Sequence, residues 1–223
     1  MSAPGRVVTA AAVVFDFDGT IVDTEWPEFV TVRDEFRAHG LELELDEFRH
    51  VVGRADHPHW TQWLRDALGR DYDLDEVVQR RRVAHHRMIA EQPVRAGVVE
   101  LLDRAAAAGV PVAVASSSPL DWVDRHLRER GLHRRFVAVV TRDHVVNAKP
   151  WPDLFLAAVA QLSVPPAHAV AIEDSHHGCT AAKDAGLACL VVPNPVTAGM
   201  DFSRADLVLD SLADATPGVL GLP

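Results

Sequence analysis

Residues 13–20 read VVFDFDGT, an apolar run that ends abruptly in two aspartates and a glycine. Acidic side chains are rarely buried unless they pair with a cation or bind a metal. Asp16 and Asp18 are two positions apart, so both would face the same side of an extended chain. A core strand that ends in this way indicates a ligand site, and Gly19 permits a sharp backbone turn beside it.

Further apolar, valine-rich runs follow this one along the chain. They are short and apolar on both faces, as buried parallel strands are, and together with the first they cover residues 11–17, 112–115, 136–141, 169–172, 188–192 and 206–209. Helical patterns separate most of them, at residues 98–108, 119–130, 151–162 and 175–185. Strands that alternate with helices predict an α/β fold with a doubly wound, Rossmann-like parallel sheet.

Residues 24–92 interrupt this alternation. They show helical patterns and no convincing strand, and the patterns cover residues 26–39, 46–52, 57–68 and 75–90. The segment directly follows the first strand and is long enough for a small domain. We therefore predict an α/β core domain formed by residues 1–23 and 93–223, with an inserted α-helical cap domain formed by residues 24–92.

The composition excludes several classes of partner. A net charge of −10 over 223 residues argues against nucleic acid and against an anionic membrane surface, since both require basic patches. No stretch approaches the ~18 apolar residues of a membrane-spanning helix. The N-terminal apolar run leads straight into Asp16, so we interpret it as a core strand rather than a signal peptide and expect a cytoplasmic protein. Two cysteines are too few for a disulfide framework.

The residues that could bind a ligand or take part in catalysis lie at the ends of the predicted strands. Ligands of open parallel sheets bind beyond the carboxyl ends of the strands, and the residues there include acids, serines and one of only two lysines: Asp16, Asp18, Ser116, Ser117, Ser118, Lys149, Glu173 and Asp174. Two like charges ~4 Å apart repel by about 4 kcal/mol at an effective dielectric near 20, so clustered carboxylates hold protons or a cation. An oxygen-only cluster suits Mg²⁺. The serines before Pro119 can bind a phosphate at a helix N-terminus or simply cap that helix.

Taken in order, these residues resemble the motifs of the haloacid dehalogenase-like (HAD) superfamily. The similarity extends over nearly the whole chain and rests on Asp16-Phe17-Asp18-Gly19-Thr20, Ser116, Lys149-Pro150 and Glu173-Asp174-Ser175. It is greatest to the group with a helical insertion after the first motif, which includes sugar-phosphate phosphatases and β-phosphoglucomutase. The resemblance implies a Mg²⁺-dependent phosphatase that hydrolyses a small phosphorylated metabolite, such as a sugar phosphate, through an aspartyl-phosphate intermediate.

The resemblance also implies a role for each motif residue. Asp16 would be the nucleophile and Asp18 the general acid and base, with Ser116 and Lys149 completing the catalytic set. The phosphate-binding residues would be Phe17, Asp18, Gly19, Ser116, Ser117 and Lys149. The ligands of Mg²⁺ would be Asp16, the backbone carbonyl of Asp18, Asp174 and, in or next to the coordination shell, Glu173.

Departures from related patterns bear on the reaction. Dehalogenases of the superfamily lack the second acid, because their leaving group needs no proton, whereas this chain has Asp18. A β-phosphoglucomutase holds a second phosphate with Lys-Asn after its serine segment and has a His soon after its first motif. Pro119-Leu120 and Glu28 stand at those places here, so we expect a phosphatase rather than a phosphomutase. A non-catalytic HAD-like binding protein is a further alternative, although every catalytic position is intact.

Substrate selection is expected in and beside the predicted cap. A purely structural role, on the surface or in the core of the cap, is the alternative for these polar and aromatic residues. The candidates are Thr20, Trp26, Arg54, His57, His59, Trp60, Trp63, Arg81 and His85. The expected partner is a small phosphorylated metabolite, with no role for nucleic acid or membrane. We expect a monomer or a weak homodimer.

Overall fold

The computed structural model describes residues 10–54, 59–69 and 74–215. Its centre is a six-stranded parallel sheet with the order β3-β2-β1-β4-β5-β6. The strands are β1 (Ala12–Phe15), β2 (Val112–Ser116), β3 (Ala138–Thr141), β4 (Ala169–Glu173), β5 (Ala188–Val191) and β6 (Leu207–Val208). The order reverses between β1 and β4, which are hydrogen-bonded neighbours. The predicted doubly wound α/β fold is therefore confirmed, and β1 lies in the middle of the sheet.

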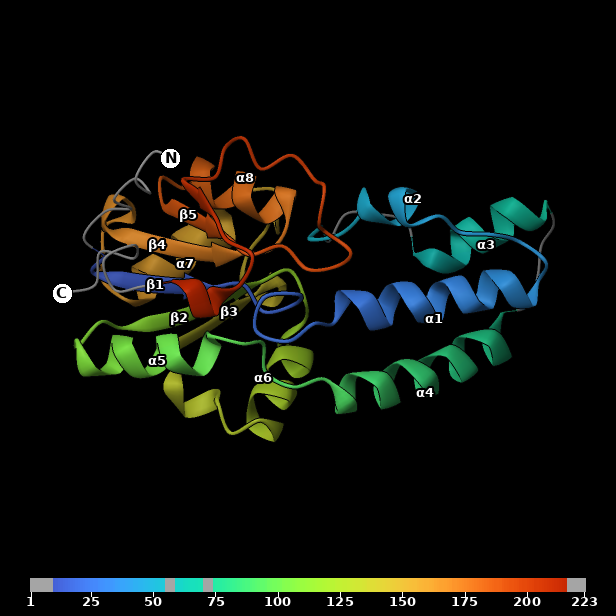
Figure 1. Cartoon of the computed structure of the whole chain (residues 1–223), viewed down its shortest axis with the longest axis horizontal. Coiled ribbons are helices and arrows are strands. Elements are labelled where there is room, and N and C mark those ends of the chain that lie inside the picture. Colours follow the sequence, from blue (N-terminus) through green and yellow to red (C-terminus); the bar gives the residue numbers. More distant parts are fainter. Residues whose placement is uncertain (1–9, 55–58, 70–73, 216–223) are drawn as a thin grey trace.

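Helices cover both faces of the sheet (Figure 1), and the strands are buried between them. One face packs against α5 (Val98–Ala107) and α6 (Leu120–Glu129), and the other against α7 (Asp153–Gln161) and α8 (His176–Asp184). Side chains of β1 alternate between the two layers, which explains why its sequence is apolar without interruption. Short 3₁₀ turns complete the core: His133–Arg135, Arg142–His144, Pro166–His168 and Leu212–Asp214.

Residues 24–92, which we call the helical insertion, contain α1 (Glu25–Ala38), α2 (Leu45–Arg49), α3 (Trp60–Leu68) and α4 (Asp75–Glu91). Figure 1 shows them beside the carboxyl edge of the sheet, with α1 and α4 side by side and antiparallel. Their apolar side chains form a cluster of their own, which includes Phe29, Phe48, Trp60 and Leu64. Val196, from the loop after β5, also packs into this cluster. That the insertion is a separate cap domain stays a prediction.

The two connections between the sheet and the helical insertion run together. Val22 on the outgoing segment forms an antiparallel bridge with Val94 on the returning segment. The Arg95 amide donates to the Ile21 carbonyl at 2.9 Å, and the Arg95 guanidinium donates to the Gly19 carbonyl. The insertion therefore leaves and re-enters the core at one point, directly beside the aspartates that follow β1.

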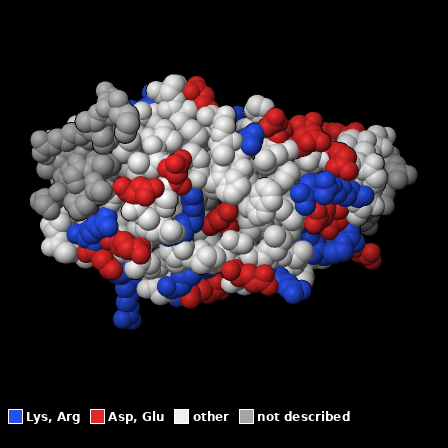
Figure 2. Space-filling view, in the orientation of Figure 1, with Lys and Arg blue, Asp and Glu red and all other residues white. Residues whose placement is uncertain are grey.

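The visible surface carries charged side chains of both signs (Figure 2). On the face that Figure 2 shows, acidic and basic side chains are interspersed over the sheet domain and the helical insertion. Among the described residues, no helix has both the length and the apolar character needed to cross a bilayer.

Gly97 offers a test of the packing at the start of α5. Its φ of +88° is left-handed, and an added Cβ would lie 2.2 Å from the Ala213 backbone nitrogen. Gly97→Ala should therefore lower the free energy of unfolding by about 3 kcal/mol, measured by urea denaturation. The matched control is Gly109→Ala, with φ +67° and open space around the new Cβ, which should cost only about 1 kcal/mol. Equal losses would contradict this explanation.

Candidate active site

A buried lysine between two carboxylates lies at the carboxyl edge of the sheet. The register of β1 with β4 pairs Phe15 with Ile172, so the residues that follow them, Asp16 and Glu173, lie side by side. Lys149 comes from the segment after β3, and its Nζ contacts Asp16 Oδ1 and lies 2.6 Å from Glu173 Oε1. The Lys149 side chain is only 1% exposed. One ammonium thus joins residues from three strand ends.

The neighbouring Asp174 and Glu173 are fixed by hydrogen bonds. Glu173 Oε2 accepts from the amides of Asp174 and Ser175, at 3.1 and 3.2 Å. The Asp174 carboxylate accepts from Asn194 Nδ2 at 2.6 Å and from the Thr20 hydroxyl at 3.3 Å. Both acids therefore have little freedom to turn away from Asp16.

Asp16, Glu173 and Asp174 form a cluster with the composition of a hard-cation site. One ligand atom from each lies within 4.8 Å of the others, and all three residues are buried. Asp16 Oδ2 is buried without a hydrogen-bond partner, so one oxygen of the cluster is free to bind a cation. Only glycine fits at position 19, because a Cβ on this residue would lie 2.3 Å from Asp174 Oδ2. The space next to the Asp174 carboxylate is therefore kept free of a side chain. This oxygen-only set fits Mg²⁺.

The electrostatics of the cluster lead to the same conclusion. Burial raises the pKa of Asp16 to about 8, with Glu173 and Asp18 adding to the rise and Lys149 opposing it. Burial likewise raises the pKa of Asp174 well above its usual range, and Asp16 and Glu173 raise it further. Burial alone would lower the pKa of Lys149, but Asp16 and Glu173 outweigh it and raise that pKa. Lys149 stays charged, yet the cluster still favours a further positive charge.

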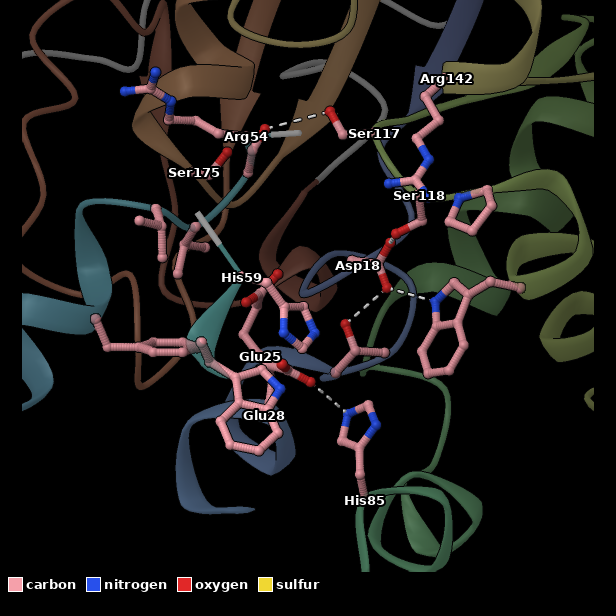
Figure 3. Close-up of a pocket in the computed structure, with 18 of the residues that line it drawn as sticks. Asp18, Glu25, Glu28, Arg54, His59, His85, Ser117, Ser118, Arg142 and Ser175 are labelled. Carbon is pink, nitrogen blue, oxygen red and sulfur yellow. Dashed lines mark hydrogen bonds and ion pairs between the residues drawn. The ribbon is translucent and has the colours of Figure 1, made fainter. Parts of the chain in front are cut away.

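Asp18 contacts different partners from Asp16. Its Oδ1 accepts from the Thr24 hydroxyl and from Trp122 Nε1, both at 2.9 Å, and its Oδ2 accepts from the hydroxyls of Ser118, at 2.6 Å, and Ser116, at 3.3 Å. β1 ends at Phe15, but the Asp16 amide still donates to the Ile172 carbonyl at 2.9 Å, and both aspartates line the same cavity. Figure 3 shows Asp18 beside Ser118 in a cavity.

The cavity lies between the carboxyl edge of the sheet and the helical insertion, and its volume is about 520 Å³. The core contributes the polar residues of the strand ends, namely Asp16, Asp18, Ser117, Ser118, Arg142, Asp174 and Ser175. The insertion contributes acids, bases and aromatic rings, among them Glu25, Glu28, Arg54, His59, Trp60, Trp63, Arg81, Arg82, His85 and His86. A small molecule in it would contact both parts of the protein.

An acid and two bases meet on the insertion side of the cavity. Glu28 Oε2 contacts the Arg81 guanidinium and lies 3.1 Å from His85 Nε2 (Figure 3 shows the latter pair). Burial lowers the pKa of His85 to about 4 against the pull of Glu28, and Arg81 lowers it further, so the imidazole is neutral at pH 7. Burial also raises the pKa of Glu25 well above its usual range, helped by Asp18 and Glu28.

Comparison with known proteins gives the family. The family model described as haloacid dehalogenase-like hydrolase matches residues 10–186, most of the chain. The chain belongs to the haloacid dehalogenase-like hydrolase family. The predicted family is thereby confirmed, in agreement with the α/β fold, and relatives named as phosphatases confirm the assignment as a hydrolase of phosphate esters.

Several relatives are similar over nearly their whole length. "Putative phosphatase YhcW" of Bacillus subtilis (strain 168) is 37% identical over 91% of this chain and 92% of its own. Protein CbbY of Cereibacter sphaeroides is 33% identical over 95% of this chain and 96% of its own. A crystal structure of an Asp-to-Asn variant of CbbY from Rhodobacter sphaeroides, in complex with xylulose-(1,5)bisphosphate, has a TM-score of 0.75 at 30% identity and covers 96% of this chain and 99% of that one.

The structure brings most of the expected substrate residues of this HAD hydrolase to one place. Arg54, His59, Trp60, Trp63, Arg81 and His85 all line the cavity. Trp26 instead packs against Phe29 in the insertion, with ring centroids 5.6 Å apart, and Thr20 donates to Asp174. His57 lies outside the described residues. Ser117 lines the cavity and donates to the Gly53 carbonyl at 3.3 Å, which joins the core to the insertion.

Other contacts of the HAD site could not be found from motifs. Asn194 reaches Asp174 from the loop after β5, and no local pattern distinguishes it from an ordinary turn residue. Trp122 reaches Asp18 from α6, where its only sequence signal is an aromatic residue just beyond the Ser-Ser-Ser-Pro helix start. Arg142 lines the cavity from the segment after β3. All three depend on how a helix, a turn or a loop beyond a strand end directs a side chain to the sheet edge.

The two lysines of the chain provide a matched pair for testing the buried cluster. Lys149→Met should lower the free energy of unfolding by about 3 kcal/mol in metal-free buffer at pH 7, because it leaves Asp16 and Glu173 buried without their cation. Lys183 pairs with Asp206 at the surface, so Lys183→Met should cost less than about 1 kcal/mol. Both values come from urea denaturation, and equal small losses would show that Lys149 does not balance the cluster.

Proposed function

We propose that this HAD hydrolase is a Mg²⁺-dependent phosphatase that hydrolyses a small phosphorylated metabolite, a sugar phosphate or a similar phosphomonoester, through an aspartyl-phosphate on Asp16. One observation carries the proposal: Asp16 has a buried, unpartnered oxygen beside Lys149, and Asp18 lies two residues further along, in a cavity of metabolite size. The complex of CbbY with xylulose-(1,5)bisphosphate supports a phosphorylated sugar as the substrate class.

Each residue has a defined task in the proposed reaction. Ser116, Lys149 and backbone amides of the loop after β1 hold the phosphoryl oxygens, which stabilises charge in the transition state. Asp16 attacks phosphorus, and Asp18 gives its proton to the departing oxygen. Water then attacks the aspartyl-phosphate while Asp18 accepts a proton from it. Asp16, Asp174 and the Asp18 carbonyl would hold Mg²⁺, with Glu173 in or next to the shell, and the ion would neutralise charge on the phosphoryl group.

The insertion side of the cavity supports transfer of the phosphoryl group to water, as in a phosphatase, rather than to a second hydroxyl of the sugar, as in a phosphomutase. Glu28 binds Arg81, so the guanidinium of Arg81 is already paired with an acid. Pro119 lines the cavity where a mutase pattern carries lysine. Arg81 lies 5.7 Å from the ring centroid of Trp60, and this mixture of charge and aromatic surface suits a hydroxylated leaving group. Arg54, Trp60, Arg81 and His85 are the proposed selecting residues.

We further propose that residues 24–92 act as a cap domain on a core formed by residues 1–23 and 93–223. The separate apolar cluster of the insertion and its paired connections at Val22 and Val94 support this division. The cytoplasmic location and the monomeric or weakly dimeric state stay predictions.

A phosphate-release screen over a panel of phosphorylated metabolites tests the activity. Wild-type protein with Mg²⁺ should release phosphate from at least one sugar phosphate, and Asp16→Asn should lower kcat by about a thousandfold or more because the nucleophile is lost. Phosphate release from no member of the panel would favour a non-catalytic binding protein. Conversion of glucose 1-phosphate to glucose 6-phosphate faster than phosphate release would favour the phosphomutase.

Metal binding can be tested without turnover. A saturating concentration of MgCl₂ should raise the Tm of the wild-type protein by about 5 °C, since a ligand that binds only the folded state stabilises it. Asp174→Asn should abolish the rise, because it removes a charged ligand of the cluster. Asp184→Asn is the control, since Asp184 pairs with Arg204 on the surface, and its rise should equal that of the wild type. A rise that survives in Asp174→Asn would contradict the proposed site.

A further inference from the structure

Among the four donors around Asp18, Trp122 differs from the others in kind. The hydroxyls of Thr24, Ser116 and Ser118 can rotate, and each can also accept a hydrogen bond. The indole N–H of Trp122 only donates, and its direction is fixed by the plane of the ring. When a substrate enters and the hydroxyls change partners, the bond from Trp122 Nε1 to Asp18 Oδ1 is the one that cannot be reassigned.

The Trp122 ring is itself held from several sides. It stacks on the His85 imidazole at 5.7 Å between centroids, with an interplanar angle of 1°, and it meets His126 edge-to-face at 4.3 Å. The Arg125 guanidinium lies 5.5 Å from the ring centroid. His126 also stacks with Phe17, the residue between the two aspartates, at 6.3 Å. Trp122 therefore has little freedom to rotate. Through His126, it also packs against the segment that contains Phe17 and Asp18.

We propose that Trp122 is a positioning residue that anchors Oδ1 of Asp18, so that Oδ2 is the oxygen that exchanges protons with the substrate and with water. The inference rests on the proposed phosphatase function. Both donors to Oδ2 can be reassigned, because Ser116 lies 3.3 Å away and Ser118, at 2.6 Å, donates through a rotatable hydroxyl, whereas Oδ1 keeps the fixed donor of Trp122. Ser116 can leave Oδ2 when it binds the phosphoryl group.

The two steps balance with this assignment. In the first, an Asp16 oxygen forms a bond to phosphorus, the bond from phosphorus to the leaving oxygen breaks, and the Oδ2 proton of Asp18 passes to that oxygen. In the second, a water oxygen forms a bond to phosphorus, the Asp16–phosphorus bond breaks, and the water gives a proton back to Oδ2. Trp122 keeps the same hydrogen bond to Oδ1 through both steps.

The stack on His85 makes this positioning depend on the helical insertion. Trp122 belongs to α6 of the core, whereas His85 belongs to α4 of the insertion and is 7% exposed. The imidazole is neutral at pH 7 and so stacks without the cost of burying a charge. The orientation of the general acid is thus coupled to the position of the insertion over the cavity.

The test compares leaving groups, because only a poor leaving group needs the proton of Asp18. Trp122→Phe retains a stacking ring and removes the N–H donor. It should lower kcat/KM about tenfold for the alkyl phosphate that the wild type cleaves fastest, and less than about twofold for p-nitrophenyl phosphate, whose nitrophenolate leaves without a proton. Equal losses for both substrates, or no loss for the alkyl phosphate, would overturn the inference.

A double variant separates positioning from simple packing. If Trp122 acts through Asp18, adding Trp122→Phe to Asp18→Asn should leave kcat/KM for the alkyl phosphate unchanged, whereas a further tenfold loss would overturn the inference. Trp151→Phe is the control, since Trp151 is exposed and does not line the cavity. It should leave kcat/KM unchanged for both substrates. If Trp122→Phe does not fold, 3-benzothienylalanine at position 122, which has the shape of tryptophan without the N–H, serves in its place with the same criteria. Absence of turnover by the wild type would refute the phosphatase function instead.

Discussion

The structure depends on one buried ammonium. Asp16, Glu173 and Asp174 are at most 6% exposed, and charges so placed would repel one another strongly without a cation among them. Lys149 supplies that charge from the segment after β3, and its Nζ lies 5.1 Å from the ring centroid of Phe155 on α7. One contact therefore fixes the relative positions of the β1 and β4 ends and of the loop that follows β3.

This arrangement divides the work of the two aspartates. Asp16 belongs to the charged cluster under the sheet edge, where burial and its neighbours set its protonation. Asp18 lines the same cavity as Asp16, but hydroxyls and an indole surround its carboxylate. Two residues of separation along the chain thus place a nucleophile and a proton carrier in different environments, as the proposed reaction requires.

Sequence reasoning could predict the sheet and the motif residues because both follow from local rules. Continuous apolar runs mark buried parallel strands, and the polar residues after them meet at one edge. It could not find Asn194 or Trp122, since each reaches the site through a loop or helix orientation that no spacing encodes. It also associated Thr20 with substrate, whereas the structure ties Thr20 to Asp174 and gives Asp18 the hydroxyl of Thr24.

The bridge between Val22 and Val94 has an evolutionary consequence. Because the outgoing and returning segments meet at one place, a helical insertion of different length or sequence could replace this one while the core still closes in the same way. The machinery for phosphoryl transfer would be inherited unchanged, while the surface that recognises the leaving group diversified. A fold built like this can acquire new substrates by exchanging a module rather than by redesigning its chemistry.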